Sequence, residues 1–537
     1  MRKYALVRVN MSKFASRVKA NMLKSDILLI GILILISLAL FVPLKGLYFQ
    51  ADEWYLFGKV LSVRDCGLVC LIKPFSYHFV PLSWFTYYYV YKQFQLHTLP
   101  YFIFTYIFSI ANVLLVYFLS RRFFTKVISF YSALFFLTFS QASQTITWYA
   151  ASLVGLPSTF LLLSGLLIYA NYERKISWGF TVAYISLFVG LLFKEDVIVA
   201  VIIIALYELI ISRNVKKFTT SAIFISLYLI LRFGSIYLYF QNVSELHIGG
   251  IDLQNVIKNS IVMPASMLAS LLINDHDKVF LGKFIGNTVL STKIIPYGFI
   301  LNADIFNEFI SFYIVGPVIG IGMGAFLLFQ KLIDKNFIRF TLLSVLVTAV
   351  PYILLPTSLR LESRHYYISA IFLSLLFGAL VRSLLEKYSS KSIIIYVVFS
   401  FIILRNTIFF HKDINHALNI ARPMASYVQA LQQASKYTSS KTIIVNTGDL
   451  PPLYSGVGYV AMVVNSNIYR YDSFFKAEDL WNWGSEGYYE HGKIGFRFYL
   501  SEKSYLDAEL LTVDAQVVKL NWNNKTLKST VGKYMEK

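Results

Sequence analysis

Eleven long apolar stretches constrain the fold of this 537-residue chain more than any other feature. Most are roughly 17–22 residues long, which matches the ~30 Å hydrocarbon core of a bilayer crossed by a helix. The mean hydropathy of +0.59 and a charged fraction of only 15% agree with this. The sequence therefore predicts an α-helical polytopic membrane protein. We place the spans at about 26–45, 99–120, 127–142, 150–170, 176–193, 196–212, 218–239, 309–330, 338–357, 366–384 and 392–410.

The positive charge of the chain, +20 overall, is concentrated where alternate spans end. Six short stretches hold 21 Lys and Arg: 1–25, 121–126, 173–175, 213–217, 331–339 and 382–391. Such a distribution is typical of cytoplasmic loops, so the charge reports topology and not nucleic-acid binding. We expect a cytoplasmic basic arm over 1–25, a transmembrane domain over 26–410 and a plasma-membrane location. No small-residue cleavage site follows the first apolar stretch, so we interpret that stretch as a retained membrane span.

Three regions are predicted to lie outside the membrane. The first, 46–98, contains two aromatic segments, Trp54–Val63 and Leu82–Phe94, which favour helices lying flat at the interface. In the second, 240–308, the apolar pieces are too short to span, which indicates interfacial or re-entrant helices. The third, 411–537, has balanced charge, and we expect a helix at about 421–437 and strands at 441–446 and 459–464. We predict a small extracytoplasmic α/β domain there.

An acidic pair, Asp52-Glu53, follows the first span in the aromatic run Leu47-Tyr-Phe-Gln-Ala-Asp-Glu-Trp54. A carboxylate held at the membrane surface can act as a general base toward an attacking hydroxyl. The pair also fits the start of an interfacial helix, where acids favour the helix dipole. The same outer region holds Cys66 and Cys70, whose spacing allows a disulfide in a helix and equally allows two free thiols.

Three further polar clusters fall at predicted outer ends of spans. A charge near the bilayer costs free energy, so a functional role could explain why these residues are there. His78 lies in the aromatic segment before Trp84 and could contact a metal, a phosphate or an acceptor. The second cluster is the short turn Lys194-Glu195-Asp196, which could bind phosphate through its lysine or form a solvated hairpin tip.

The last cluster precedes the tenth span and contains Glu362, Arg364 and His365. Arginine forks suit bidentate phosphate binding, and Arg364 departs from the positive-inside trend. Arg232, in the outer half of the seventh span, could face the same site or extend to the interface. Together the four clusters predict a site for a lipid-linked anionic donor, with its tail in the bilayer and its phosphate at the surface.

These segments resemble the GT-C superfamily of membrane glycosyltransferases, and most closely its protein O-mannosyltransferase-like branch. The similarity covers about residues 26–385. It lies in the order of basic arm, first span and acidic pair, and in four later motifs. Those motifs are His78-Phe-Val-Pro81-Leu-Ser-Trp-Phe-Thr-Tyr with Leu96-His-Thr-Leu-Pro-Tyr101, Leu192-Phe-Lys194-Glu195-Asp196, Leu206-Tyr-Glu208-Leu209 and Glu362-Ser-Arg364-His-Tyr366-Tyr.

The resemblance implies transfer of a sugar from a polyprenyl-phosphate carrier to a glycan, lipid or protein acceptor on the outer face. It implies that Asp52 is the base and that Glu53 holds the acceptor or a divalent ion. Metal dependence stays open, with Asp52, Glu53 and His78 as candidate ligands and no other cofactor expected.

The charged residues can then be given roles in that reaction. Lys194, Arg232 and Arg364 are the candidate phosphate-binding residues. His78, Glu195, Asp196, Glu362 and His365 are the candidate acceptor or loop contacts.

Two other functions stay open from the sequence. A lipid or solute transporter would also be polytopic, but it places ionisable residues and broken helices near the midplane, whereas these charges lie at the outer ends. A glycan polymerase or ligase would use the same carrier with a longer donor.

Overall fold

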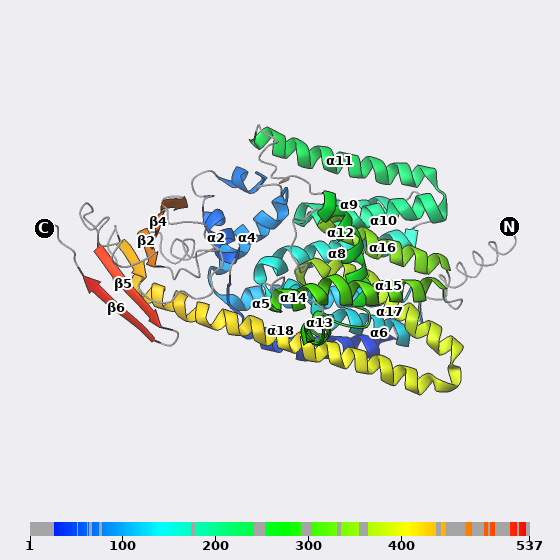
Figure 1. The fold of residues 1–537 in the computed structure, drawn as a ribbon. Helices are drawn as coiled ribbons and strands as arrows, with labels where there is room; N and C mark the ends of the chain where they lie inside the picture. The colour runs from blue at the N-terminus through cyan, green and yellow to red at the C-terminus, as the bar shows by residue number, and fades with distance from the viewer. Residues whose placement is uncertain are drawn as a thin grey trace.

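The computed structural model describes residues 26–50, 52–61, 63, 67–74, 78–172, 178–240, 253–291, 303–329, 335–353 and 363–435, and six strands between 442 and 532. Figure 1 shows a bundle of long helices with a sheet beyond one end, reached by the last helix. The basic arm, Cys66, Glu362 and the strand expected at 459–464 lie outside the described residues.

Seven helices within the described residues have both the length and the apolar composition of membrane spans. They are Asp26–Gly46, Thr98–Ser120, Tyr149–Asn171, Val215–Tyr239, Phe306–Phe329, Ser363–Lys387 and Ser389–Gln429. Shorter apolar helices cover Lys126–Leu137, Trp178–Phe193 and Phe337–Ile353, while the stretch predicted at 196–212 forms a short helix and a π-helical turn. The chain is a helical membrane protein, as the apolar stretches predicted.

The bundle is built from a long series of helices, named here in chain order. Before the second outer region they are α5 (Thr98–Ser120), α6 (Lys126–Leu137), η3 (Ser140–Ala142), α7 (Gln144–Thr147), α8 (Tyr149–Tyr172), α9 (Trp178–Phe193), η4 (Glu195–Val197), α10 (Ile198–Leu206), η5 (Tyr207–Ser212) and α11 (Val215–Phe240). Within that region, or at its end, lie α12 (Leu253–Ala269), α13 (Asp275–Ser291) and α14 (Ala303–Phe309). After it come η8 (Ile310–Val315), α15 (Gly316–Phe329), α16 (Lys335–Ile353), η9 (Ser363–Tyr366), α17 (Tyr367–Lys387), η10 (Ser389–Lys391) and α18 (Ser392–Ser435).

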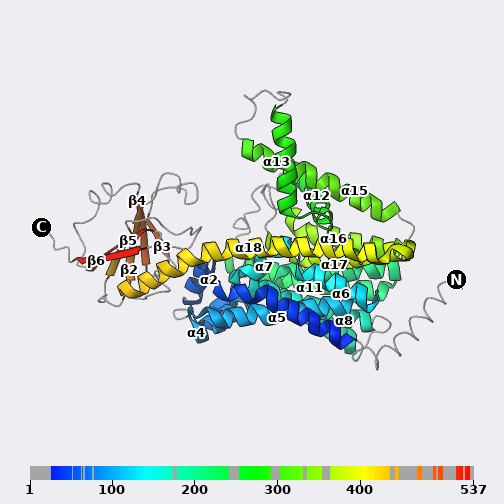
Figure 2. The ribbon, with the colours of Figure 1, turned by 90° about the horizontal axis from the view of Figure 1, so that it is seen from below.

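The last helix, α18, differs from the sequence prediction. We expected a span at 392–410 and a separate helix at 421–437, but one continuous helix of 44 residues joins them. At about 1.5 Å per residue it is far longer than a bilayer is thick. The polar stretch between the two predicted helices contains neither Gly nor Pro, so nothing local ends the first helix. Figure 2 shows α18 running along the whole bundle to the sheet.

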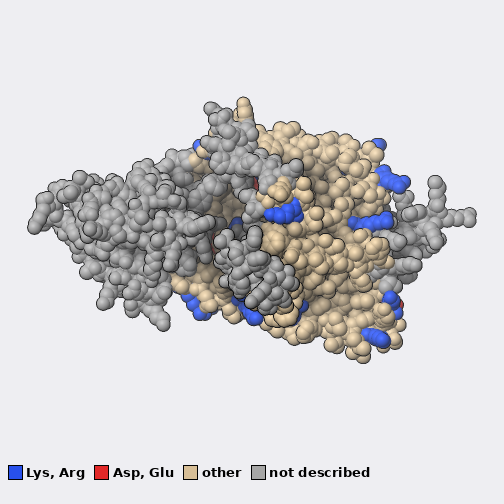
Figure 3. Space-filling model, in the orientation of Figure 1, with Lys and Arg blue, Asp and Glu red and all other residues tan. Residues whose placement is uncertain are grey.

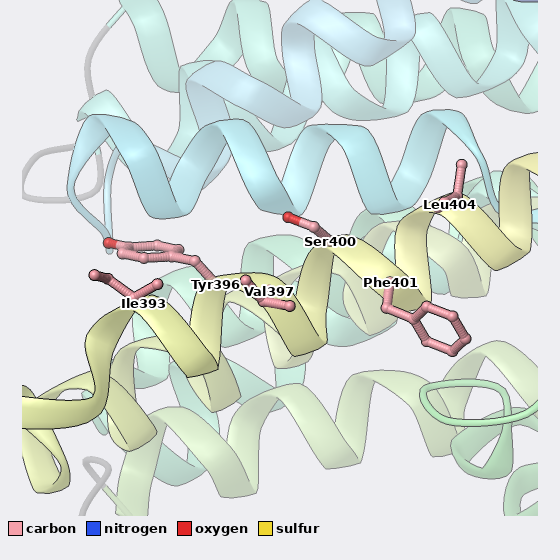
Figure 4. A pocket seen from close by; sticks show the side chains of 6 residues that line it. All are labelled: Ile393, Tyr396, Val397, Ser400, Phe401 and Leu404. Atoms are coloured by element: carbon pink, nitrogen blue, oxygen red, sulfur yellow. The ribbon is translucent and has the colours of Figure 1, made fainter.

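The surface of the bundle is largely apolar. Figure 3 shows a face made mostly of uncharged side chains, with scattered Lys and Arg, several of them near its right-hand edge. Large side chains such as Ile393, Val397 and Phe401 of α18 are more than half exposed. A shallow apolar groove of about 470 Å³ lies there, and Figure 4 shows the six side chains that line it: Ile393, Tyr396, Val397, Ser400, Phe401 and Leu404. Such surface is suited to contact with lipid chains.

The first outer region contributes α2 (Asp52–Leu61), η2 (Leu68–Leu71) and α4 (Pro81–Phe94), close to the two interfacial helices expected. Cys70 is disulfide-bonded in η2. Buried aromatic rings fix α2 to the bundle. Phe49 lies 4.9 Å from Tyr101 of α5 and 5.7 Å from Tyr149 of α8, measured between ring centroids. This packing holds the residues that follow the first span against the ends of two transmembrane helices.

Beyond α18, the described strands form one mixed sheet in the order β3-β4-β2-β1-β5-β6. The strands are β1 (Thr442–Asn446), β2 (Ile468–Phe474), β3 (Tyr488–His491), β4 (Ile494–Tyr499), β5 (Gln516–Asn523) and β6 (Thr526–Gly532). The central strand β1 pairs in parallel with β2 and β5, whereas the edge strands β3 and β6 pair antiparallel. The strand β1 falls where the sequence predicted one.

Close packing between α12 and α15 depends on a glycine. A Cβ added at Gly320 would overlap the carbonyl oxygen of Ala265, a backbone atom that cannot turn away. At Gly322, on the same helix, a Cβ would meet no described atom within 4 Å.

We predict that Gly320→Ala lowers the free energy of unfolding by about 1–3 kcal/mol, because the two helices must separate to admit the methyl group. Gly322→Ala, the matched control, is expected to leave it unchanged or raise it slightly. Apparent melting temperatures of the purified variants test this. Equal melting temperatures for both variants would contradict the packing described.

Candidate functional site

Glu53, in the first turn of α2, is fully buried. Its carboxylate accepts hydrogen bonds from Trp148 Nε1 at 2.8 Å, Ala150 N at 3.1 Å and Gln50 N at 3.2 Å. Burial raises the pKa of Glu53 to about 7, although these N–H donors oppose the shift. Glu53 therefore fastens α2 to the segment between α7 and α8. The neighbouring Asp52 begins α2, and its side chain lies outside what the structure describes.

Arg364, in η9, packs on the same segment. Its guanidinium carbon lies 4.7 Å from the centroid of the Trp148 ring, a cation–π contact. Its backbone N–H donates to Gln144 Oε1 at 3.3 Å, and its carbonyl accepts from Thr145 Oγ1 at 3.3 Å. The polar turn between α6 and α8 thus fixes Arg364 at both its backbone and its side chain.

Lys194 and Asp196 form a second contact group at the turn between α9 and α10. Lys194 has extended backbone between the two helical segments, and its Nζ lies 2.7 Å from Asp196 Oδ2. Tyr352, at the end of α16, donates its hydroxyl to the same carboxylate at 2.8 Å. The ring centroid of His365 lies 4.5 Å from that of Tyr352. This group joins α9, α16 and η9.

Glu195 links the same turn to the first outer region and to α11. Its carboxylate lies 2.9 Å from His78 Nδ1 and 3.6 Å from an Arg232 nitrogen, and it accepts from Phe79 N at 3.0 Å. Burial opposes ionisation of Glu195, but the hydrogen bond and charge of His78, the charge of Arg232 and the Phe79 N–H outweigh it and lower the pKa. Glu195 is therefore an ionised anchor for the His78 imidazole and the Arg232 guanidinium.

The structure brings most of the predicted site residues into one continuous set of contacts, although they come from distant parts of the sequence. The set runs from Glu53 through Trp148 to Arg364, whose neighbour His365 packs its ring on Tyr352, and Tyr352 in turn donates to Asp196 of the turn between α9 and α10. Its predicted members are Glu53, His78, Lys194, Glu195, Asp196, Arg232, Arg364 and His365. We call it the charged cluster. It lies at the end of the bundle that holds α2 and α4 (Figure 1), which the charge distribution predicts to face outward.

Three members of the cluster were missed in the sequence. Trp148 and Gln144 lie in the turn between two predicted spans, and Tyr352 lies beside Pro351 near the end of another. The available signal was the polar composition of 140–148 at a predicted outer end. A Trp or Tyr at such a position is also typical of an interfacial anchor, so their contacts could not be foreseen.

The described residues contain no group of three or more His, Cys, Asp or Glu side chains placed to hold a metal ion. Of the candidate ligands, Glu53 accepts three N–H hydrogen bonds and His78 pairs with Glu195. Neither side chain has the geometry of a metal ligand here, and we assign no step to a metal.

No family model matches this sequence, and no curated protein matches it. Among solved structures, the chain is similar to ArnT from Cupriavidus metallidurans, whose crystal structure is bound to undecaprenyl phosphate. The alignment covers 91% of this chain and 92% of that chain, with 13% identical residues and a TM-score of 0.41. The function therefore has to be inferred from the residues of the charged cluster.

The raised pKa of Glu53 predicts a pH-dependent stability. The folded state keeps the proton to about pH 7, whereas an unfolded glutamate loses it near pH 4.5. Stability from this group is therefore complete below about pH 4.5 and is lost as the pH rises toward 7. We expect wild type to lose up to about 3 kcal/mol over this range relative to Glu53→Gln.

Apparent melting temperatures of wild type and Glu53→Gln from pH 4 to 8 measure this difference. Glu386→Gln, an exposed acid paired with Arg382, is the control and should follow wild type. Parallel curves for wild type and Glu53→Gln would contradict a raised pKa.

Proposed function

We propose that this protein is a glycosyltransferase that moves a sugar from a polyprenyl-phosphate-linked donor to an acceptor hydroxyl at the membrane surface. The observation that supports this most is the convergence of Lys194, Arg232 and Arg364 in one cluster at the ends of apolar helices. These side chains come from α9–η4, α11 and η9, and a common ligand explains why they meet. The likeness to the GT-C superfamily in the sequence leads to the same class of reaction.

The charge of the cluster suits a lipid phosphate. It contains three cationic side chains, of which Lys194 pairs with Asp196 and Arg232 with Glu195. Arginine and lysine side chains form strong charge-assisted hydrogen bonds with phosphate oxygens. The level of the cluster, at the ends of α9, α16 and α17, matches a donor whose tail stays among lipid chains.

The proposed reaction is a single displacement step. The acceptor hydroxyl oxygen forms a bond to the anomeric carbon, and the bond from that carbon to the phosphate oxygen breaks with its electron pair. Asp52 takes the hydroxyl proton as general base. Arg364 and Lys194, with Arg232, stabilise the negative charge that grows on the departing phosphate.

The remaining candidate residues take supporting roles in this proposal. Glu195 and Asp196 orient Arg232 and Lys194 through ion pairs. His78 is held by Glu195 at a partly exposed position, from which it can reach the acceptor or the loop that binds it. Glu362 and His365 stay candidate contacts at the start of α17, and Glu53 is reassigned from chemistry to positioning.

Transfer from radiolabelled polyprenyl-phosphate sugars to acceptors in membranes tests the proposal. We expect Asp52→Asn and Arg364→Ala each to reduce transfer by about 100-fold or more, since both act in the transition state. Arg382→Ala, an exposed arginine of α17 paired with Glu386, is the matched control and should transfer normally.

Each alternative outcome has a distinct meaning. A near-normal rate for Arg364→Ala would contradict the phosphate role, and a normal rate for Asp52→Asn would place the base elsewhere. If wild type transferred no sugar from any donor and instead moved a lipid or solute across vesicles, the protein would be a transporter.

A further inference from the structure

Arg364 depends on a residue that the sequence did not single out. An arginine side chain has many rotamers, so binding a phosphate in one geometry requires that something restrict it beforehand. In this structure the restriction comes from Trp148, whose ring lies under the guanidinium at 4.7 Å. A cation over an indole face is attracted by the ring quadrupole, which favours this position of the guanidinium over others.

The indole is itself held from its other edge. Trp148 Nε1 donates to Glu53 Oε2 at 2.8 Å, and the Ala150 N–H donates to the second oxygen of the same carboxylate at 3.1 Å. Gln50, just before α2, donates its side-chain amide to the Thr147 carbonyl at 3.3 Å. The backbone on both sides of Trp148 is thus tied to the first outer region, and the ring cannot turn without breaking its bond to a buried acid.

The same segment also forms hydrogen bonds with the backbone of Arg364, through Gln144 and Thr145. Residues 144–148 therefore hold both the side chain and the backbone of Arg364 in place. A displacement of α2 would be transmitted to Arg364 through one indole ring.

We infer that Trp148 is a positioning residue that couples the buried Glu53 of α2 to the phosphate-binding arginine Arg364. The inference rests on the proposed function for the ligand of Arg364, but the coupling itself rests on the contacts alone. It gives Glu53, enclosed by N–H donors, a role that requires no contact with a substrate. It also gives the two residues of the acidic pair different roles: Asp52 is the general base, and Glu53 positions Arg364 through Trp148.

A double-mutant cycle on phosphate affinity tests this. The variants are Trp148→Leu, Arg364→Ala and the double variant, with Trp178→Leu as control because Trp178 is 78% exposed on α9. The probe is undecaprenyl phosphate, titrated against the purified full-length protein in detergent. We expect each single variant to weaken binding by about 10-fold or more, the double variant to bind no more weakly than Arg364→Ala, and the control to bind normally.

Two results would overturn the inference: multiplied losses in the double variant, or unchanged affinity in Trp148→Leu. If Trp148→Leu does not fold, Trp148→Phe replaces it. Phe keeps a smaller ring face and loses the N–H to Glu53, so it should weaken binding by about 3-fold, and only while Arg364 is present.

A thermal cycle keeps the coupling testable if wild type binds no polyprenyl phosphate, an outcome that would refute the proposed ligand. We then expect Trp148→Phe to lower the apparent melting temperature more in wild type than in Arg364→Ala. Equal decreases in the two backgrounds would overturn the coupling, whatever the ligand proves to be.

Discussion

Pairing of charges at membrane level is the constraint on which the rest of this structure depends. An uncompensated cation or carboxylate beside the hydrocarbon core is costly, so Lys194 and Arg232 can stay there only with acidic partners. Asp196 and Glu195 provide those partners from a single turn between α9 and α10. That turn draws α11, α16 and the segment before α4 toward one point. The geometry of the site is in this sense a consequence of satisfying two partly buried ion pairs.

Beneath the ion pairs, aromatic packing gives the cluster a rigid base. Phe49, Tyr101 and Tyr149 hold the start of α2 against α5 and α8, and the buried Glu53 then orders the segment that carries Trp148. A reaction at the surface needs positioned groups more than mobile ones, because charge stabilisation works best when donors are fixed in advance. We therefore propose that Asp52 and the cationic side chains carry out the chemistry, and that buried aromatic and acidic groups position them.

The sequence predicted the parts of this structure that depend on local signals. The apolar stretches gave the helices, and the aromatic segments gave α2 and α4 to within a few residues. It also placed His78, the Lys194 turn and Arg364 on one side of the membrane. It could not predict that Glu53 turns inward, because its donors Trp148 and Ala150 come from a different pair of helices. Nor could it predict Tyr352 as a partner of Asp196, 156 residues away, or the continuity of α18. These features arise from tertiary contacts, which the local pattern does not encode.

The most direct test of the account is an experimental structure of the protein with a polyprenyl phosphate bound. The account predicts that the phosphate lies within hydrogen-bond distance of the Arg364 guanidinium and the Lys194 ammonium, with Trp148 still under the guanidinium. A phosphate bound elsewhere, for example with its chain in the apolar groove of α18 and no contact to either cation, would contradict the central claim.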